Sequence, residues 1–349
     1  MLKKWAAMLL CLIAAVNLSA CSNNQGSTPA ATTAAEESST TESSAEQTST
    51  AEQSKIKVTV TFDAMKEFVA AVGKDKVDIS TVIPAGTEAH DFEPKAQDLA
   101  GISDAKVFVY NGLGMEGWVE EALSAVNNTD LIVVEASKGA DVIERETASE
   151  DDHEEDGDHE EEADHEEDGE DEDGHSHGKY DPHLWLSLKG AQTEVMNIKD
   201  ALVEADPSNK EYYEQNSNDY ISQLKTLYNE YIGKFQSAEK KTFVTGHAAF
   251  GYLCRDFGLE QNSVRDIFAD GEPSAQQLAQ LVEYCRENNV TTIFAEEMVS
   301  PAVSQTLANE VGAAVETVYT IESAQDDMTY LERMESNLSK IYDSLTGNS

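Results

Sequence analysis

The segment DPSNKEYYEQNSNDYISQLKTLYNEYIGKF, residues 206–235, separates two regions in which strand-like and helix-like runs alternate. Asp206 and Pro207 are placed as a helix start, because proline is favoured in the first helical turn. Six apolar positions then recur at helical spacing and form one face: Tyr213, Tyr220, Leu224, Leu227, Tyr231 and Phe235. We therefore predict one long linking helix over residues 206–236, with a folded lobe on each side.

The region before the helix, residues 55–205, contains short apolar runs followed by helical patterns. Alternation of this kind indicates βα units and a parallel sheet. The expected strands are KIKVTVT (55–61), VDISTVI (77–83), KVFVY (106–110) and LIVVEA (131–136). We expect an N-terminal α/β lobe here.

The region after the helix, residues 237–349, repeats the pattern. Strands are expected at KTFVTG (241–246), TTIFAEE (291–297) and VETVYTIE (315–322), with helices near 248–257 and 274–288. A chain of 349 residues with 40% apolar content can build two domains, each with its own core. The predicted fold class is α/β, with two Rossmann-like lobes that contain parallel sheets and are joined by one long rigid helix.

The formal net charge of −43 excludes one class of partner. Only 24 lysines and arginines stand against 67 acidic residues, whereas binding of nucleic acid requires a basic surface. The charge favours cations as ligands instead.

The N-terminus has the pattern of a secretory signal over residues 1–20, with Lys3 and Lys4 before an apolar run. LSAC (18–21) has the form of a lipoprotein box, which would make Cys21 the lipidated first residue of the mature chain. An ordinary cleaved signal or an uncleaved anchor is the alternative. Residues 21–54 are rich in Ser, Thr and Glu and lack aromatic residues, so we expect a disordered tether. We expect a chain lipid-anchored on the outer face of the cell membrane.

Two further cysteines, Cys254 and Cys285, lie in the second lobe. Outside the cell they could form one disulfide. Two separate buried thiols are an equal alternative, since the sequence does not give the distance between their Cα atoms.

An acidic insertion, residues 145–178, interrupts the first lobe. Residues 150–173 hold eighteen acids and no apolar residue larger than Ala163, so charge repulsion predicts a disordered loop. The loop also carries five histidines: His153, His159, His165, His175 and His177. Simple solvation is the ordinary role of such a run, but in-phase histidines favour weak capture of metal ions.

Only three histidines lie outside the loop, and each is flanked by Gly or Pro at an inter-element boundary. They are His90 in PAGTEAHDFEP, His183 in YDPHLWLSL and His247 in VTGHAAFGY. Ligands of open α/β sheets bind beyond the carboxyl ends of strands, where His90, His247 and the acid Glu322 are expected. Taken alone, a histidine after a strand is more often a structural residue than a ligand, and Glu322 alone would be a solvated strand end. Together they predict a metal site in the cleft between two facing lobes.

These motifs, with EPS (272–274) and IFAEEMVSP (293–301), resemble the metal-binding lipoproteins of ABC importers, the cluster A-I solute-binding proteins. The resemblance extends over nearly all of residues 55–345 and implies two α/β lobes, one linking helix and a metal between the lobes. It implies as partners an ABC permease and its ATPase, contact with the membrane through a lipid anchor only, and a monomer.

The resemblance also implies a ligand set: His90 within AHDFEP, His183 within DPHLW, His247 within VTGHAAFGY and a carboxylate after the last strand. That carboxylate falls on Glu322, with Glu297, Asp326 and Asp327 as competitors. Histidine at the third position is typical of zinc-transporting members, whereas manganese-type members tend to have glutamate there.

Three imidazoles and one carboxylate suit Zn²⁺, because Mn²⁺ and Mg²⁺ prefer oxygen-rich octahedra. We expect one tight zinc site in the cleft and weak sites in the loop. Copper would bind such ligands at least as strongly. The alternative is a protein of the same family that binds manganese or another divalent metal.

We expect no enzyme activity. A secreted zinc hydrolase is the less favoured alternative, because four protein ligands would leave no open position for water and the chain has no HExxH helix. A surface adhesin is a third class, to which only the exposed location points.

Overall fold

The computed structural model describes residues 55–145, 178–266, 273–297, 301–324 and 326–347. Its first sheet contains four parallel strands in the order β2-β1-β3-β4. The strands are β1 Ile56–Val60, β2 Val77–Thr81, β3 Val107–Tyr110 and β4 Ile132–Glu135. All four fall inside the strands expected from the sequence, because each apolar run is short and is bounded by turn residues.

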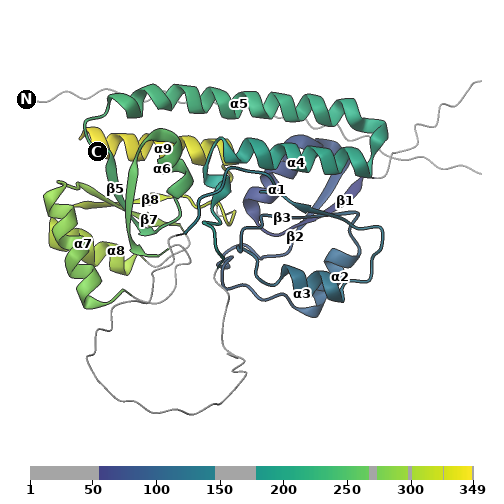
Figure 1. Ribbon diagram of the computed structural model, residues 1–349, viewed down its shortest axis with the longest axis horizontal. Helices are drawn as coiled ribbons and strands as arrows, with labels where there is room; N and C mark the ends of the chain where they lie inside the picture. The colour runs from purple at the N-terminus through teal and green to yellow at the C-terminus, as the bar shows by residue number, and fades with distance from the viewer. Residues whose placement is uncertain (1–54, 146–177, 267–272, 298–300, 325, 348–349) are drawn as a thin grey trace, which may run out of the picture. The chain divides into compact units, whose positions relative to one another are not determined.

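The helices of this lobe cover the two faces of its sheet (Figure 1). They are α1 Asp63–Gly73, α2 Ala96–Ser103, α3 Val119–Ala125 and α4 Gly190–Ala205, with short 3₁₀ turns η1 Lys74–Lys76 and η2 Leu184–Leu186. A small cluster that includes Ile102, Phe108 and Val119 is buried under α2 and α3. The βα alternation thus gives the doubly covered parallel sheet that we expected.

The second sheet has the same topology, in the order β6-β5-β7-β8, and is also parallel. Its elements are β5 Thr242–His247, α6 Gly251–Phe257, β6 Glu260–Arg265, α7 Ala275–Glu287, β7 Thr292–Glu296, α8 Ala302–Val311, β8 Ala314–Val318 and α9 Tyr330–Thr346. Sequence inspection missed β6 because EQNSVR carries a single apolar residue, Val264. β8 ends at Val318, four residues earlier than expected.

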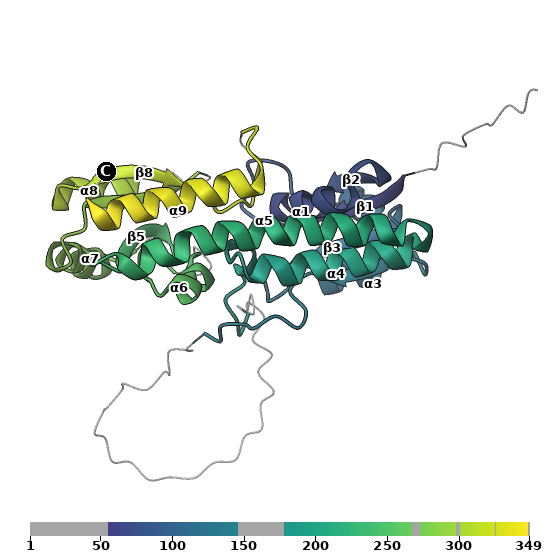
Figure 2. The same cartoon turned by 90° about the horizontal axis from the view of Figure 1, so that it is seen from above.

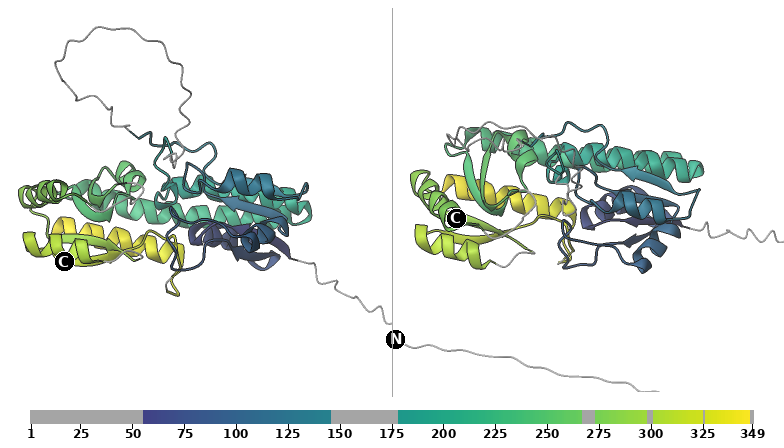
Figure 3. Two further views of the ribbon diagram at one scale, coloured as in Figure 1. Left: turned by 90° about the horizontal axis from the view of Figure 1, so that it is seen from below. Right: turned by 60° about the horizontal axis from the view of Figure 1, so that its bottom comes forward.

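The linking helix α5 runs without interruption from Lys210 to Ser237, after the 3₁₀ turn η3 Pro207–Asn209. Five of the six apolar positions of the predicted face are buried, and Tyr220 is half-buried. Figure 1 shows α5 passing over both lobes, and Figure 2 shows it between α4 and α9. In both views of Figure 3 the two sheets lie toward opposite ends of this helix.

One hydrophobic cluster extends through both lobes, which differs from the two separate cores that we expected. It joins Val58 and Phe68 of the first lobe to Leu224 and Phe235 of α5 and to Phe243 of the second. The reason is that α5 and α9 supply a layer of apolar side chains shared by the two sheets. A second cluster, with Leu281 and Ile293, lies on the outer face of the second sheet.

Cys254 and Cys285 are free thiols, so the disulfide alternative is wrong. Cys254 is buried in the shared cluster and Cys285 in the outer cluster of the second lobe, which separates them. Burial raises the pKa of the Cys285 thiol to about 11 and raises that of Cys254 further. No helix among the described residues is long and apolar enough to cross a membrane.

Candidate metal centre

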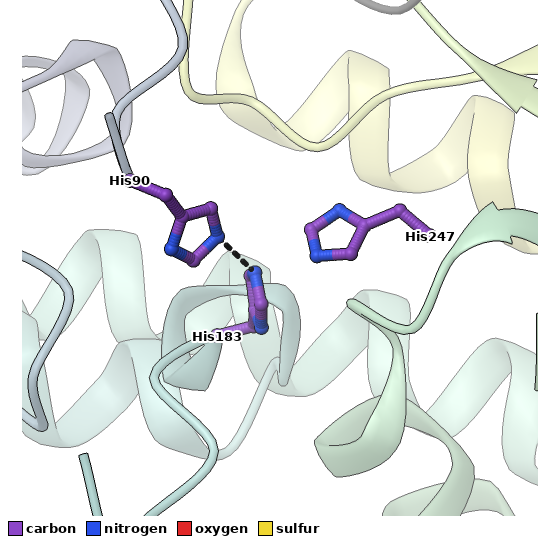
Figure 4. Close-up of side chains that lie close together, drawn as sticks. All are labelled: His90, His183 and His247. Carbon is purple, nitrogen blue, oxygen red and sulfur yellow. Dashed lines mark hydrogen bonds between the residues drawn. The ribbon is translucent and has the colours of Figure 1, made fainter. Parts of the chain in front are cut away.

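Three segments that are far apart in the sequence bring the three histidines together (Figure 4). His90 lies in the loop that follows β2, His183 directly precedes η2, and His247 is the last residue of β5. His183 and His247 are buried, with 0% and 1% exposure, and His90 is half-buried. The cluster is therefore open to solvent on the side of His90.

The distances within this cluster suit one metal ion. Ligand nitrogens of His90, His183 and His247 all lie within 4.8 Å of one another, and the Nε2 atoms of His90 and His183 are 3.1 Å apart. Two ligands of a tetrahedral zinc ion, each at about 2.05 Å, stand about 3.3 Å apart. The imidazoles therefore need only small shifts to share an ion.

The ring of His183 is held by Asp181, two residues earlier. Asp181 Oδ1 accepts from His183 Nδ1 at 2.9 Å and from the backbone N–H of His183 at 2.9 Å. The hydroxyl of Tyr252 donates to the Asp181 carbonyl at 2.6 Å, and Asn111 Nδ2 donates to the Pro182 carbonyl at 2.9 Å. The contact at Nδ1 leaves Nε2 to face the other histidines, as in metal sites whose ligands are oriented by a carboxylate.

His247 is positioned by the strand that it ends. Its backbone N–H donates to Glu296 Oε1 at 2.8 Å, at the carboxyl end of the neighbouring strand β7. Gly246 allows this approach, because a Cβ there would lie 2.5 Å from Glu296 Oε2. Burial raises the pKa of Glu296 to about 7.

Glu322 approaches the cluster from a turn after β8 whose backbone is strained. Ile321 has φ +59°, an uncommon value for a β-branched residue. Glu297 holds this turn, because its carboxylate accepts the N–H groups of Thr320 and Ile321 at 2.9 and 3.1 Å. The carbonyls of Ile321 and Glu322 in turn accept from the N–H groups of Ala64 and Asp63, at the start of α1.

Among the four acids considered for the fourth position, only Glu322 joins a histidine in a donor group. Ligand atoms of Glu322, His90 and Glu88 all lie within 4.8 Å of one another. Glu297 is engaged by the turn, Asp326 forms an ion pair with Arg333 at 2.9 Å, and Asp327 is exposed. The structure thus has two overlapping donor groups, one with three histidines and one with two carboxylates, which share His90.

The carboxyl groups of the second group have raised pKa values. Burial, followed by the neighbouring charge of Glu88, raises the pKa of Glu322 well above its ordinary value. Burial also raises the pKa of Glu88. A cation placed between them would favour the ionised forms, since an opposite charge lowers a carboxyl pKa.

Two residues of this centre were missed in the sequence. Glu88 precedes His90 by two positions, as Asp181 precedes His183. An acid two residues before a histidine was the available signal, but the spacing alone does not tell a ligand from an orienting carboxylate or a solvated acid. Cys21 and the loop histidines His153, His159, His165, His175 and His177 lie outside the described residues.

A site with three imidazoles and a buried carboxylate suits ion binding. Comparison with known proteins agrees with this chemistry. Residues 58–344 match the family described as zinc-uptake complex component A, periplasmic. The chain is 40% identical to the high-affinity zinc uptake system protein ZnuA of Bacillus subtilis (strain 168), over 99% of both chains.

Solved structures with the same fold include proteins of streptococci. The Zn(II)-bound ZnuA-like domain of Streptococcus pneumoniae AdcA has a TM-score of 0.67 and 31% identity, over 84% of this chain and 99% of that one. A mutant of the laminin-binding adhesin of Streptococcus agalactiae has a TM-score of 0.70 and 32% identity, over 83% and 99%. From the length of the match and these identities, the chain belongs to the family of the periplasmic zinc-uptake component ZnuA.

Proposed function

We propose that this protein captures Zn²⁺ outside the cell membrane and delivers it to an ABC permease with its ATPase. The observation that carries the proposal is that ligand atoms of His90, His183 and His247 all lie within 4.8 Å of one another. The buried carboxylate of Glu322 lies within the same distance of His90. We assign these four residues as the ligands of a single tight site. Family membership and the zinc-named relatives support the same cargo.

The donor set favours zinc over the other divalent ions. Three nitrogens and one oxygen match the tetrahedral preference of Zn²⁺, whereas Mn²⁺ takes more oxygen ligands. Copper would compete on affinity, so its exclusion depends on geometry and availability. A filled tetrahedron holds cargo and leaves no position for a catalytic water, which disfavours a hydrolase.

The anchor and the acidic loop complete the proposal. Cys21 would carry the lipid that keeps the protein at the outer face of the membrane, as a monomer. The loop histidines would bind zinc weakly near the cleft, since His177 is six residues from His183, at most about 20 Å of chain. An ion on the loop then has an effective concentration near the cleft of about a millimolar.

Calorimetric zinc titration of the mature chain separates the two classes of site. We expect one tight site together with several weak ones. His247→Ala should remove the tight site and leave the weak ones, whereas deletion of residues 150–178 should do the opposite. His153→Ala is the matched control, since it removes one imidazole without touching the cleft.

An anomalous diffraction scan across the zinc edge of metal-loaded crystals would identify the ion and its ligands. Tight binding that survives His247→Ala, or that disappears with the loop, would refute the assignment of the site.

A further inference from the structure

Glu88 lies beside the proposed zinc centre but is not one of its four proposed ligands. It is half-buried in the loop after β2, and its carboxylate reaches within 4.8 Å of donor atoms of His90 and Glu322. His183 and His247, which belong to the other donor group, are both buried. Glu88 and His90 are therefore the more exposed donors of the centre.

Glu322 supplies an independent sign of a ligand at this position. Its side chain is 4% exposed, and its Oε2 atom has no hydrogen-bond partner among the described residues. A buried carboxylate oxygen without a partner is costly, so native proteins rarely keep one without a ligand or water to satisfy it. The carboxylate of Glu322 belongs to the same donor group as Glu88 and His90.

Two carboxylates and one imidazole form a donor set distinct from the histidine cluster. Carboxylates bind divalent ions with fast exchange and modest selectivity, whereas three imidazoles hold zinc more selectively. An ion held by Glu88, His90 and Glu322 would already contact two of the four ligands of the tight site. It could enter the cluster by exchanging Glu88 for His183 and His247, without returning to water.

We propose that Glu88, His90 and Glu322 form an outer divalent-cation subsite through which zinc enters and leaves the tight centre. This inference rests on the proposed function, because the inner site is the destination of the ion. Glu88 acts as a transfer donor and is absent from the final coordination sphere. Its effect is therefore on rates rather than on equilibrium affinity.

Stopped-flow kinetics of the full mature chain test this step, with a chelator that keeps the weak loop sites empty. Glu88→Gln should slow both zinc capture and zinc release by about tenfold, which corresponds to a barrier about 1.4 kcal/mol higher, since it removes a ligand of the transfer state. The dissociation constant should change far less, because the two rates change together. Glu88→Asp, which keeps a shorter carboxylate, should give intermediate rates.

Asp91→Asn is the matched control, because Asp91 is exposed in the same loop and the substitution removes the same charge. It should leave both rates near those of the wild type. Equal behaviour of Glu88→Gln and Asp91→Asn would overturn the subsite. So would faster release with weakened affinity, which would make Glu88 a permanent ligand. Failure of the proposed function has a different signature, namely tight zinc binding that persists in His247→Ala.

Discussion

The two lobes share one strand order but contribute unequally to the proposed zinc site. β2-β1-β3-β4 and β6-β5-β7-β8 are the same parallel arrangement, and each places its ligands beyond the carboxyl ends of its strands. The first lobe contributes His90 and His183, whereas the second contributes His247 directly from β5.

Glu322 adds to the contrast between the ligands that the two lobes contribute. It follows β8 in the chain, yet hydrogen bonds attach its turn to the first lobe. The N–H groups of Asp63 and Ala64 donate to the turn, and Trp185 Nε1 donates to the Thr320 carbonyl at 2.7 Å. The turn of Glu322 is thus bonded to the first lobe as well as, through Glu297, to the second, whereas His247 belongs to the second lobe alone.

Arg333 on α9 offers the strongest way to break this attachment. Its guanidinium is 2% exposed and pairs with Asp63 of α1 at 2.6 Å and with Asp326 at 2.9 Å. Arg333→Met should lower the free energy of unfolding by about 3–5 kcal/mol, because the buried Asp63 carboxylate keeps only the half-exposed Lys66, at 3.6 Å, as a counterion. Urea unfolding measures the loss.

Arg286→Met is the control for that change, since Arg286 is exposed and its guanidinium donates to the Glu310 carbonyl at 2.9 Å. It should cost less than about 1 kcal/mol. Equal losses for the two variants would show that the contact between α9 and α1 adds no special stability.

The orienting carboxylate of His183 gives the next effect. Asp181→Asn should weaken tight zinc binding by about 10- to 100-fold, because it removes the charged acceptor that fixes the imidazole. Glu296→Gln should have a smaller effect, since Glu296 holds His247 by its backbone N–H and not by its imidazole. Competition with a chelator of known affinity measures both.

Asp141→Asn, at a highly exposed carboxylate, should leave zinc binding unchanged. If Glu296→Gln weakened zinc binding more than Asp181→Asn did, zinc binding would depend more on the positioning of His247 than on that of His183, contrary to this prediction.

Glu194 on α4 of the first lobe should make the stability of the protein depend on pH. It is fully buried, both carboxyl oxygens lack partners among the described residues, and burial followed by the charge of Glu116 raises its pKa well above the ordinary value. The folded state therefore keeps this proton while the unfolded chain loses it above about pH 4.3. Because the unfolded state then binds fewer protons, the free energy of unfolding falls as pH rises.

Glu194→Gln should remove this fall. Relative to the variant, the wild type should lose stability as pH rises above about 4.3, by at most about 1.4 kcal/mol per pH unit, measured by urea unfolding without metal. Glu204→Gln changes an exposed position of the same helix, so its free energy of unfolding should depend on pH as that of the wild type does. If the unfolding free energies of Glu194→Gln and of the wild type had the same pH dependence, the Glu194 carboxyl would be ionised in the folded protein.

The two buried thiols give the smallest effect. Since Cys254 and Cys285 are free and lie in different clusters, reductant should leave the urea midpoint unchanged. A thiol reagent should label neither cysteine in the native protein. A urea midpoint that falls when reductant is added would instead support a disulfide between Cys254 and Cys285.

The sequence alone determined the parts of the fold that depend on local patterns. Seven of the eight described strands, the linking helix and its buried face follow from apolar periodicity and from turn residues. The eighth strand, β6, was invisible because its pairing with β5, rather than its polar sequence, makes it a strand. The three histidines were visible because few histidines lie outside the acidic loop and each stands at an element boundary.

Only the tertiary structure decided which acids belong beside those histidines. Glu322, Glu297, Asp326 and Asp327 are alike in sequence, and their roles separate only through the strained Ile321 turn and its bonds to α1. The shared core, the free cysteines and the second donor group around Glu88 also depend on contacts between distant segments. Local propensity carries no information about such contacts, because they are set by how whole elements pack.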